Sequence, residues 1–265
     1  MGKKTLSYLR KRKKSKTSCN QLDQAHNLKK SRPLIDEWHR LEKELAQAKT
    51  PEEAAQTNVK MEEFGGLQRY QDASITYQVK SVSKFNAAKW VTSCLKKRDR
   101  PIRLLDVGAL TNHFLPFSSW IDCTAIDLNP RHPSVLKYDF FDYHPGDVRF
   151  DVVVLSLVLN YVPCKTKRAL MIKQSAELLA DLNSALFIIL PKACTENSRY
   201  LNQTTFVNGL KKFGLEPVDS HCKSSTKLSF WMLRKCAPDE SVCMPNKILR
   251  SGDGHNNFRI DFSGV

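Results

Sequence analysis

The chain has 265 residues, of which 41% are hydrophobic, so it is long enough for one substantial core with extensions. Its net charge of +15 disfavours a metabolic enzyme with a neutral surface and predicts a polyanionic partner, nucleic acid before membrane. No apolar run reaches ~18 residues and the basic N-terminus lacks an apolar core, so we expect no membrane anchor or secretory signal, and a cytosolic or nuclear protein.

The eight cysteines are scattered, with no C-x-x-C pair and no histidine pair at zinc-ligand spacing. We therefore expect reduced thiols and no structural metal.

Residues 1–16 contain eight lysines and arginines and no acidic residue. Self-repulsion and the lack of apolar side chains predict a disordered arm over residues 1–32. Its densest part is a run of five basic residues, Arg10, Lys11, Arg12, Lys13 and Lys14. This run favours a nuclear or nucleolar targeting signal or an RNA-binding clamp. A merely solvated tail is the alternative.

Residues 33–64 have the pattern of a helical hairpin, because apolar residues recur at three- and four-residue spacing. Thr50-Pro51-Glu52-Glu53 supplies an N-cap, a proline at the first helical position and a reciprocal carboxylate for the second helix. Gly65-Gly66 predicts a left-handed end to that helix. We expect this hairpin to form a lid on the following domain rather than a separate module, and residues 33–80 to comprise the hairpin and a cofactor-covering loop.

The stretch after these helices holds Tyr70, Gln71 and Gln78. If it folds over a bound ligand, its amides could pair with the carboxylate and ammonium of an amino acid moiety. Ordinary helix packing is an equally weighted alternative.

Two apolar, β-branched runs, residues 102–107 and 121–127, organise the centre of the chain after a helix predicted over residues 84–97. Each run ends in an acidic residue and a loop, and Asp127 follows Gly108 by about 20 residues, the spacing of a nucleotide-binding half-sheet. Only one glycine stands where a dinucleotide fingerprint has three, and the loop after it is bulky. These features favour a nucleoside ligand without phosphates, of which S-adenosylmethionine (SAM) is the common example.

Acidic residues at the strand ends have separate predicted roles. Asp106 would position the loop that contains Gly108. Asp127 would accept from the ribose hydroxyls, with a turn cap before Asn129-Pro130 as the alternative. Asp139 would accept from the adenine amine while Phe140 packs on the ring.

Residues 151–163 are the second decisive stretch. Residues 151–155 predict a central strand buried on both faces. The following loop leaves the carboxyl edge of the sheet, where open α/β sheets perform their chemistry. Asn160 there offers a donor and an acceptor, and Tyr161 offers a face on which an extruded base can stack. Packing of Tyr161 under the next helix is the alternative.

The remaining pattern completes a sheet. A helix over residues 165–182, a buried strand over 184–191 and a helix over 206–213 precede two strands, 215–222 and 227–235, joined by a polar turn. A mostly parallel sheet that ends in an antiparallel hairpin is the class I methyltransferase arrangement. The predicted fold class is therefore α/β, with a Rossmann-like sheet and an N-terminal helical extension.

We place the methyltransferase domain at residues 81–236. A loop at residues 197–201 within it puts Arg199 where it could meet phosphate. Residues 237–265 have the pattern of a tail that docks back onto the domain.

Five ordered motifs together resemble the fungal nucleolar family that methylates adenine N1 in 25S ribosomal RNA. They are GGL with YQDAS at residues 65–74, LDVGAL at 105–110, IDLN at 126–129, SLVLNYVP at 156–163 and NSRYL at 197–201. The resemblance covers roughly residues 60 to 260 of the printed sequence. The family's SAM contacts carry over to Gly108 and Asp127. The chain departs from the family at Tyr77, where a glycine is expected before Gln78.

The resemblance implies SAM as cofactor, ribosomal RNA or the pre-60S particle as partner, and a nucleolar location. We expect a monomer without metal. The predicted cofactor-binding residues are Asp106, Val107, Gly108, Ala109, Asp127, Leu128, Asp139, Phe140, Ser156 and Gln78. The predicted RNA-binding residues are the basic run at residues 10–14 and Arg199.

The implied reaction is an in-line methyl transfer to the neutral N1 lone pair of adenine. Because N1 is already nucleophilic, positioning and desolvation rather than a strong base should supply most of the rate. N1 lies on the Watson–Crick edge, so the base must be unpaired and extruded. Asn160 would accept from the N6 amine and Tyr161 would stack on the base.

Two other classes of function stay open. One is a SAM-binding sensor or scaffold that transfers no methyl group, which the +15 charge disfavours. The other is a methyltransferase that acts on a small molecule or a protein. A nicotinamide dehydrogenase is least favoured, because the glycines of its fingerprint are missing.

Overall fold

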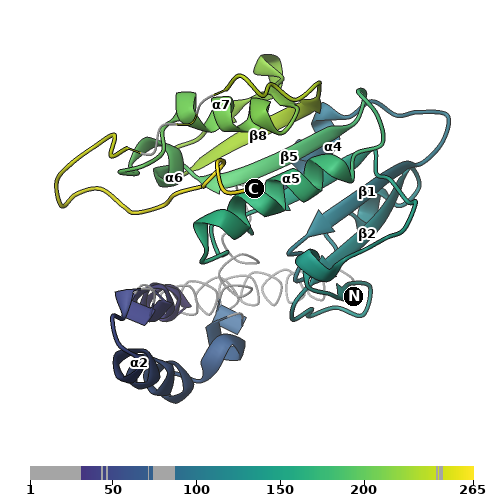
Figure 1. Cartoon of the computed structure of the whole chain (residues 1–265). Coiled ribbons are helices and arrows are strands. Elements are labelled where there is room, and N and C mark those ends of the chain that lie inside the picture. The colour runs from purple at the N-terminus through teal and green to yellow at the C-terminus, as the bar shows by residue number, and fades with distance from the viewer. Residues whose placement is uncertain are drawn as a thin grey trace, which may run out of the picture. The chain divides into compact units, whose positions relative to one another are not determined.

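The structure is a computed structural model that describes residues 31–42, 44–45, 47–70, 72–73, 87–242, 244 and 247–265 (Figure 1). The described residues fall into two compact units, one before residue 87 and one from residue 87 onward. The basic run at residues 10–14 and the predicted cofactor residue Gln78 lie outside the described residues, as does Gln71.

The first unit contains both predicted helices. Residues 31–42, 44–45 and 47 are helical, and α2 spans Pro51–Glu63. The Thr50 hydroxyl caps α2 by accepting from the Glu53 amide at 3.2 Å. The Glu53 carboxylate reaches back to the amide of the residue before the cap, at 2.7 Å. The predicted start of this helix is confirmed, with the reciprocal bond displaced by one residue.

Tyr70 belongs to an aromatic cluster of the first unit. Gly65 has a φ of +103° and ends α2 in the predicted left-handed turn. Beyond it, the Tyr70 ring stacks on Trp38 with centroids 5.5 Å apart, and Phe64 lies 5.9 Å from the same indole. Tyr70 is only 7% exposed. The structure therefore realises the helix-packing alternative for Tyr70, because stacking on Trp38 buries its ring.

The second unit is built on one sheet with the strand order β3-β2-β1-β4-β5-β8-β6, and β7 pairs with β8 (Figure 1). β1 to β5 pair in parallel, whereas β8 runs antiparallel to β5 and β6. The predicted class I methyltransferase fold is confirmed. The strands are β1 (Ile102–Val107), β2 (Ile121–Asp127), β3 (Leu136–Lys137), β4 (Val152–Ser156), β5 (Ala185–Pro191), β6 (Leu215–Pro217), β7 (Lys223–Ser224) and β8 (Leu228–Lys235).

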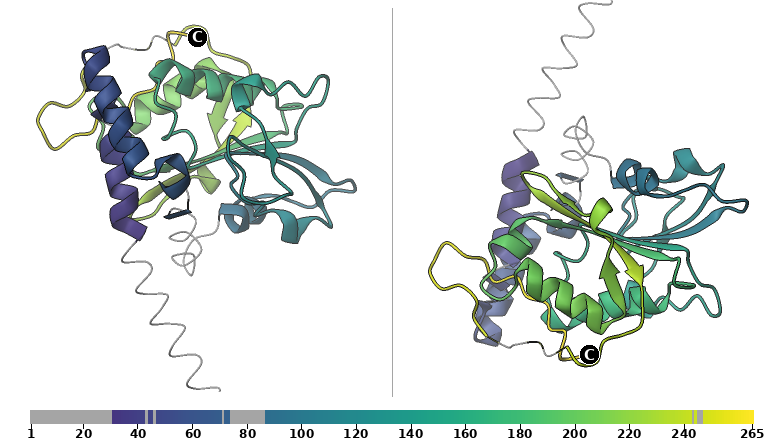
Figure 2. Two further views of the ribbon diagram at one scale, coloured as in Figure 1. Left: turned by 90° about the horizontal axis from the view of Figure 1, so that it is seen from below. Right: turned by 90° about the horizontal axis from the view of Figure 1, so that it is seen from above.

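Helices cover both faces of this sheet. Neighbouring residues of β8 make the arrangement visible, because adjacent side chains of a strand point to opposite faces. Phe230 packs on Trp90 of α4, and Trp231 packs on Phe206 of α7, with ring centroids 5.1 and 5.3 Å apart. α4 and α7 therefore lie on opposite sides of the sheet (Figure 2). The helices are α4 (Ala87–Cys94), α5 (Lys165–Glu177), α6 (Ala193–Glu196) and α7 (Gln203–Lys212), with 3-10 turns η1 (Leu115–Phe117), η2 (Phe140–Asp142) and η3 (Asp219–His221).

The antiparallel end of the sheet differs from the prediction in one element. The strand predicted over residues 215–222 is regular only in β6, and η3 and the short β7 follow it. β6 ends at Pro217, and the chain leaves the regular strand because the 3-10 turn η3 begins at Asp219. The chain still returns to β8, since the Val218 amide donates to Met232 O at 2.9 Å.

Asp151 is a buried carboxylate at the amino end of β4. It accepts from Arg98 at 3.0 Å, from Arg100 at 2.6 and 2.8 Å and from the Arg103 amide at 2.9 Å. Burial raises the pKa of Asp151, but these hydrogen bonds outweigh it and the pKa lies below its ordinary value. Because this group lies at the edge opposite the carboxyl ends of the parallel strands, its role is structural.

The C-terminal segment, residues 247–265, packs on the second unit. Its Asn256 amide side chain donates to Ala193 O of α6 at 2.7 Å, and the yellow segment runs past α6 in Figure 1. Ile260 and Phe262 are 5% and 1% exposed and belong to the main core. Gly209 of α7 lies directly under the Phe262 ring, because a Cβ added there would come within 2.3 Å of it. The segment is thus part of the folded unit.

Candidate cofactor and substrate site

Three strand ends meet at one edge of the sheet. β1 is flanked by β2 and β4, and Asp106 is in register with Ala125 of β2 and Val154 of β4. Because all three strands are parallel, their carboxyl ends bring Gly108, Asp127 and the loop after β4 to the same edge.

Gly108 is required by close packing between two of these loops. Its φ is +73°, and a Cβ there would lie 2.6 Å from Cγ2 of Val158 in the loop after β4. Glycine adopts this conformation without the steric penalty of other residues. Val107 and Ala109 on either side are 2% and 5% exposed. Their side chains therefore pack in the core, and only their backbone atoms could face a ligand.

The loop after β1 is not a phosphate cradle. The amides of Gly108 and Ala109 both donate to Ile126 O, at 2.9 and 3.1 Å. Phosphate-binding loops keep such amides free for the ligand and lead into a helix N-terminus. Between β1 and β2, a stretch that the structure describes throughout, the only helical element is the three-residue η1. The geometry supports a ligand without phosphates.

Two carboxylates make the site electronegative. Burial raises the pKa of Asp106 to about 7, and the nearby Asp127 charge adds to the increase. Burial also raises the pKa of Asp127, against the lowering effects of the Asn129 amide, which donates to its Oδ1 at 2.7 Å, and of Arg131. A ligand that carries positive charge, as SAM does on its sulfonium and ammonium groups, would relieve this repulsion.

Asp127 therefore caps the turn at Asn129, as the alternative to ribose binding predicted. A carboxylate has about four acceptor positions, so capping the Asn129 amide leaves it able to accept from ribose hydroxyls.

The predicted adenine side lies beyond β2. The Tyr138 amide donates to Asp127 O at 3.0 Å, which connects the ends of β2 and β3. Asp139 Oδ1 accepts from the Phe141 amide at 2.9 Å and so caps η2, while Phe140 is 6% exposed in the core. Leu128 is 60% exposed. An adenine contact of Asp139 and Phe140 stays a prediction.

The loop after β4, residues 157–163, is called the substrate loop below. Ser156, half-buried, ends β4 just before it. Leu157 has a φ of +57°, a left-handed conformation rare for a branched side chain, and its amide donates to Ile189 O at 3.0 Å. Such strain persists only where the surroundings enforce it, and it is concentrated at functional sites.

Asn160 in the substrate loop holds a buried acceptor. Its Oδ1 is buried and has no hydrogen-bond partner within the part of the chain that the structure describes. Leaving such an oxygen unpaired costs about 1–3 kcal/mol. The Tyr161 side chain is 38% exposed, and stacking of a base on it stays a prediction.

Arg199 is engaged within the chain. Its guanidinium donates to Gly252 O at 2.7 Å and to Asn257 Oδ1 at 2.6 Å. The loop at residues 197–201 therefore anchors the C-terminal segment. A phosphate contact of Arg199 stays a prediction.

Arg168 of α5 was missed by sequence reasoning. Its Nε donates to Val162 O of the substrate loop at 2.6 Å. The only signal in the sequence is an arginine next to the buried Ala169 in an amphipathic helix, which many surface helices share.

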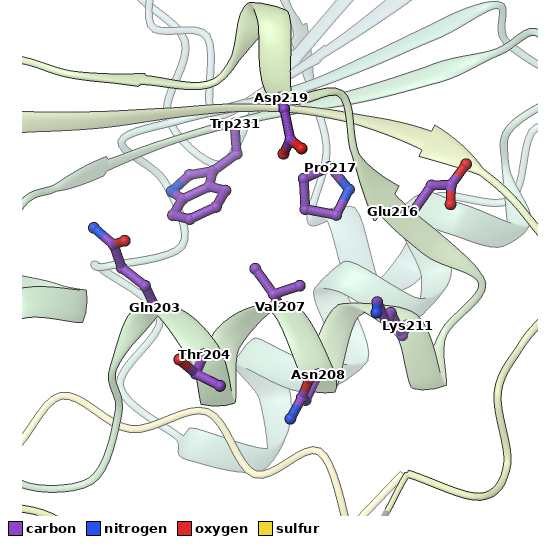
Figure 3. A pocket seen from close by; sticks show the side chains of 9 residues that line it. All are labelled: Gln203, Thr204, Val207, Asn208, Lys211, Glu216, Pro217, Asp219 and Trp231. Atoms are coloured by element: carbon purple, nitrogen blue, oxygen red, sulfur yellow. The ribbon is translucent and has the colours of Figure 1, made fainter.

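A cavity of about 540 Å³ lies away from these loops, between α7, β6 and β8 (Figure 3). Trp231, Val207 and Pro217 form its apolar walls, with polar side chains such as Gln203 and Asn208 around them. None of the predicted site residues lines it.

The residues at the carboxyl edge fit SAM. They combine a tight glycine turn, two carboxylates and an unpaired amide oxygen, and they offer no phosphate cradle. Within the described ranges, no three His, Cys, Asp or Glu side chains are grouped to hold a metal ion. No described helix is long and apolar enough to span a membrane.

Comparison with known proteins identifies the family of this chain. A model of the family described as 25S rRNA (adenine(2142)-N(1))-methyltransferase, Bmt2, matches residues 55–260. The 25S rRNA adenine-N(1) methyltransferase of Schizosaccharomyces pombe is 29% identical over an alignment of 265 positions. The alignment covers 93% of this chain and 96% of that protein. The 25S rRNA (adenine(2142)-N(1))-methyltransferase of Saccharomyces cerevisiae is 30% identical over 74% of this chain, which spans only 60% of that protein.

Two further similarities are more distant. The S-adenosylmethionine sensor upstream of mTORC1 of Xenopus laevis is 30% identical over 52% of this chain and 43% of its own length. A Burkholderia thailandensis 1,6-didemethyltoxoflavin-N1-methyltransferase structure superposes with a TM-score of 0.51 at 16% identity, over 72% of this chain and 92% of that one. The latter similarity concerns the fold alone.

Proposed function

Because the chain belongs to the family of 25S rRNA (adenine(2142)-N(1))-methyltransferases, we propose that it transfers the methyl group of SAM to N1 of an adenine in 25S ribosomal RNA. Gly108, Asp127 and Asp106 would hold the cofactor, which supplies an electrophilic methyl group when bound. The substrate loop would hold the adenine.

The observation that carries the adenine assignment is the buried Oδ1 of Asn160, which has no hydrogen-bond partner among the described residues. The exocyclic amine N6 of adenine is a donor next to N1, so a buried acceptor that takes this hydrogen bond would fix N1 in place. Guanine and the pyrimidine uracil present a carbonyl oxygen at the corresponding position, which would repel Oδ1. The loop would thus favour bases with an exocyclic amine, adenine and cytosine, over guanine and uracil, and the larger purine would bring N1 to the methyl group.

The reaction needs little acid–base chemistry from the protein. In such a transfer the N1 lone pair would form the new N–C bond while the S–C bond of SAM breaks. The electron pair of the S–C bond would stay on sulfur, and no proton would have to leave N1. The positive charge moves from sulfur to the purine ring. Asp106 and Asp127 keep this region electronegative. Such a site stabilises the cationic product better than a site lined with lysines would.

We further propose that the RNA partner is a ribosomal RNA of the pre-60S particle in the nucleolus, and that the protein acts as a monomer. The +15 charge and the basic run at residues 10–14 support a polyanionic partner. The exposed Tyr161 supports stacking on an extruded base, since N1 is hidden in a paired base.

Substitution of Asn160 tests the adenine assignment. Asn160→Ala should lower kcat on a 25S rRNA fragment by roughly 100-fold, because the substrate base loses its fixed orientation. SAM affinity measured by calorimetry should stay unchanged. The thermal midpoint should stay the same or rise, because the variant removes a buried oxygen without a partner.

Asn160→Asp is the matched control. It keeps the acceptor oxygen and should retain more 1-methyladenosine formation, measured by mass spectrometry of RNA nucleosides, than Asn160→Ala. Wild-type activity of Asn160→Ala at unchanged SAM affinity would refute the role of Asn160.

A SAM sensor is the second candidate function, because a protein named as such is 30% identical over 52% of this chain. A sensor would bind SAM without transferring its methyl group. Calorimetric SAM binding together with complementation of cells that lack this protein separates the two. Restored 1-methyladenosine in 25S rRNA supports the methyltransferase, whereas SAM binding without any restored methylation supports the sensor.

A further inference from the structure

Arg168 joins the substrate loop to the C-terminal segment. Its Nε donates to Val162 O at 2.6 Å, and its Nη1 donates to Arg259 O at 2.8 Å. Its Cζ lies 4.4 Å from the centroid of the Phe258 ring, a cation–π distance. One side chain thus holds two backbone segments that lie about a hundred residues apart in sequence.

The contacts use the shape of the guanidinium. Within the described residues, no carboxylate lies within ion-pair distance of Arg168. Burial of the Arg168 guanidinium lowers its pKa. Two carbonyl oxygens and a ring face balance the charge instead. A planar fork can donate in two directions while it stacks, whereas a lysine ammonium cannot reproduce that geometry.

The segment behind Arg168 is firmly anchored. The Asp261 amide donates to Lys165 O at 3.1 Å, and its carboxylate lies 3.2 Å from Lys165 Nζ. The Ser198 hydroxyl donates to Phe258 O, and Phe262 is buried in the core. Because these contacts fix the far side of Arg168, the guanidinium can hold Val162 in one position.

We infer that Arg168 is a positioning residue for methyl transfer, through which the C-terminal segment fixes the substrate loop. Val162 lies two residues from Asn160 and one from Tyr161, so a shift of its carbonyl would move both side chains. The inference rests on the proposed function, since it assigns a task to the loop that would hold the adenine.

Arg168→Lys tests this inference in the full-length protein. Because the lysine can reach one carbonyl at most, hydrogen–deuterium exchange over residues 158–163 should rise severalfold, while residues 102–109 stay protected. kcat on the rRNA fragment should fall by roughly 10- to 100-fold, the scale of a misplacement of about 1 Å. The Kd for SAM should stay within about twofold.

Two controls make the test specific. Arg250→Lys removes a guanidinium that also ties the C-terminal segment to two carbonyls, those of Ser198 and Leu201, but touches no residue of the substrate loop. It should leave exchange over residues 158–163 and kcat near wild type. Phe258→Leu should act in the same direction as Arg168→Lys, and the double variant should lose less than the product of the two effects.

The outcomes are distinct. Unchanged exchange of the substrate loop in Arg168→Lys overturns the inference. The inference is also overturned if Arg168→Lys and Arg250→Lys lose SAM affinity, kcat and thermal midpoint to the same extent. Equal losses of this kind would indicate general destabilisation. If the wild-type protein methylates no rRNA, the proposed function fails, but the exchange measurement still decides whether Arg168 positions the loop.

Discussion

Asp106 is the residue whose titration bears most directly on the site. Its carboxyl is buried, and its pKa is raised to about 7 in the folded protein, from an ordinary value near 3.8. A raised pKa means that the folded protein binds a proton more tightly than the unfolded chain does. Stability from this group is therefore fully present below pH 3.8 and is lost as the pH rises to about 7.

Asp106→Asn should remove this dependence. Between pH 5 and pH 8, the free energy of unfolding of the wild-type protein without cofactor should fall relative to that of the variant by roughly 3 kcal/mol, from about two pKa units of titration. Urea denaturation at both pH values measures the difference. Asp122→Asn, which removes an exposed carboxylate from β2, is the control. Parallel pH profiles of the wild type and Asp106→Asn would contradict the expectation.

Individual residues differ in how far the sequence predicted them. Gly108 and Asp127 follow strands, so their place at the carboxyl edge follows from the strand pattern itself. Asn160 was predicted by the same reasoning, but only the structure shows that its Oδ1 is buried without a described partner. Arg199 has the sequence context of a surface phosphate contact. Its bonds to Gly252 and Asn257 depend on a segment more than 50 residues away, which no local pattern reveals.

At the scale of elements, the site is made by loops packed on each other. The turn after β1 and the substrate loop touch where Gly108 meets Val158. The first residues of the substrate loop therefore pack against the turn that would bind SAM, whereas Arg168 holds the loop at its other end, at Val162.

Gly108→Ala should expose this link. The variant incurs the left-handed strain of about 1 kcal/mol and adds a Cβ that would lie 2.6 Å from Val158, so SAM affinity should fall by roughly tenfold or more. Calorimetry of SAM binding and denaturation measure the two effects.

Gly146→Ala is the matched control for that variant. Gly146 has a φ of +62° but nothing within 4 Å of an added Cβ, so only the backbone strain applies. Adding Val158→Ala to Gly108→Ala should recover part of the SAM affinity. If Gly108→Ala and Gly146→Ala destabilise equally and SAM affinity is kept, the loops are not linked in this way.

The elements themselves were largely predictable because strands and helices have distinct apolar periods. The exceptions arise where contacts with other parts of the fold override the local sequence pattern. The strand predicted over residues 215–222 ends at Pro217, and a 3-10 turn over Asp219–His221 follows it. For Tyr70 the sequence left open a cofactor contact or packing within the helices. In the structure its ring stacks on the indole of Trp38 within the first unit.

At the scale of the whole molecule, charge is the leading feature. The chain carries +15, and residues 1–16 contribute eight of its positive charges without an acidic residue. Such a distribution predicts RNA affinity that falls steeply with salt, because bound cations are released from the phosphates.

Replacing the five basic residues at positions 10–14 by glutamine should weaken binding of a 25S rRNA fragment. The slope of log affinity against log salt should become shallower by roughly 0.7 to 0.9 for each phosphate that the arm no longer neutralises. SAM affinity should not change. A control variant with the residues of the arm in scrambled order, and so with equal charge, should keep the wild-type slope. An unchanged slope in the glutamine variant would show that the arm does not bind the RNA.

By itself the sequence determined the α/β class, the mostly parallel sheet and the edge where Gly108, Asp127 and Asn160 lie. It could do so because strand ends are local features, and parallel strands necessarily bring their carboxyl ends together. Only the tertiary structure decided how the substrate loop is held, since Arg168 meets Val162, Phe258 and Arg259 through contacts between distant segments. Such contacts depend on where the C-terminal segment returns to the domain, and they leave no period or spacing in the sequence to be read.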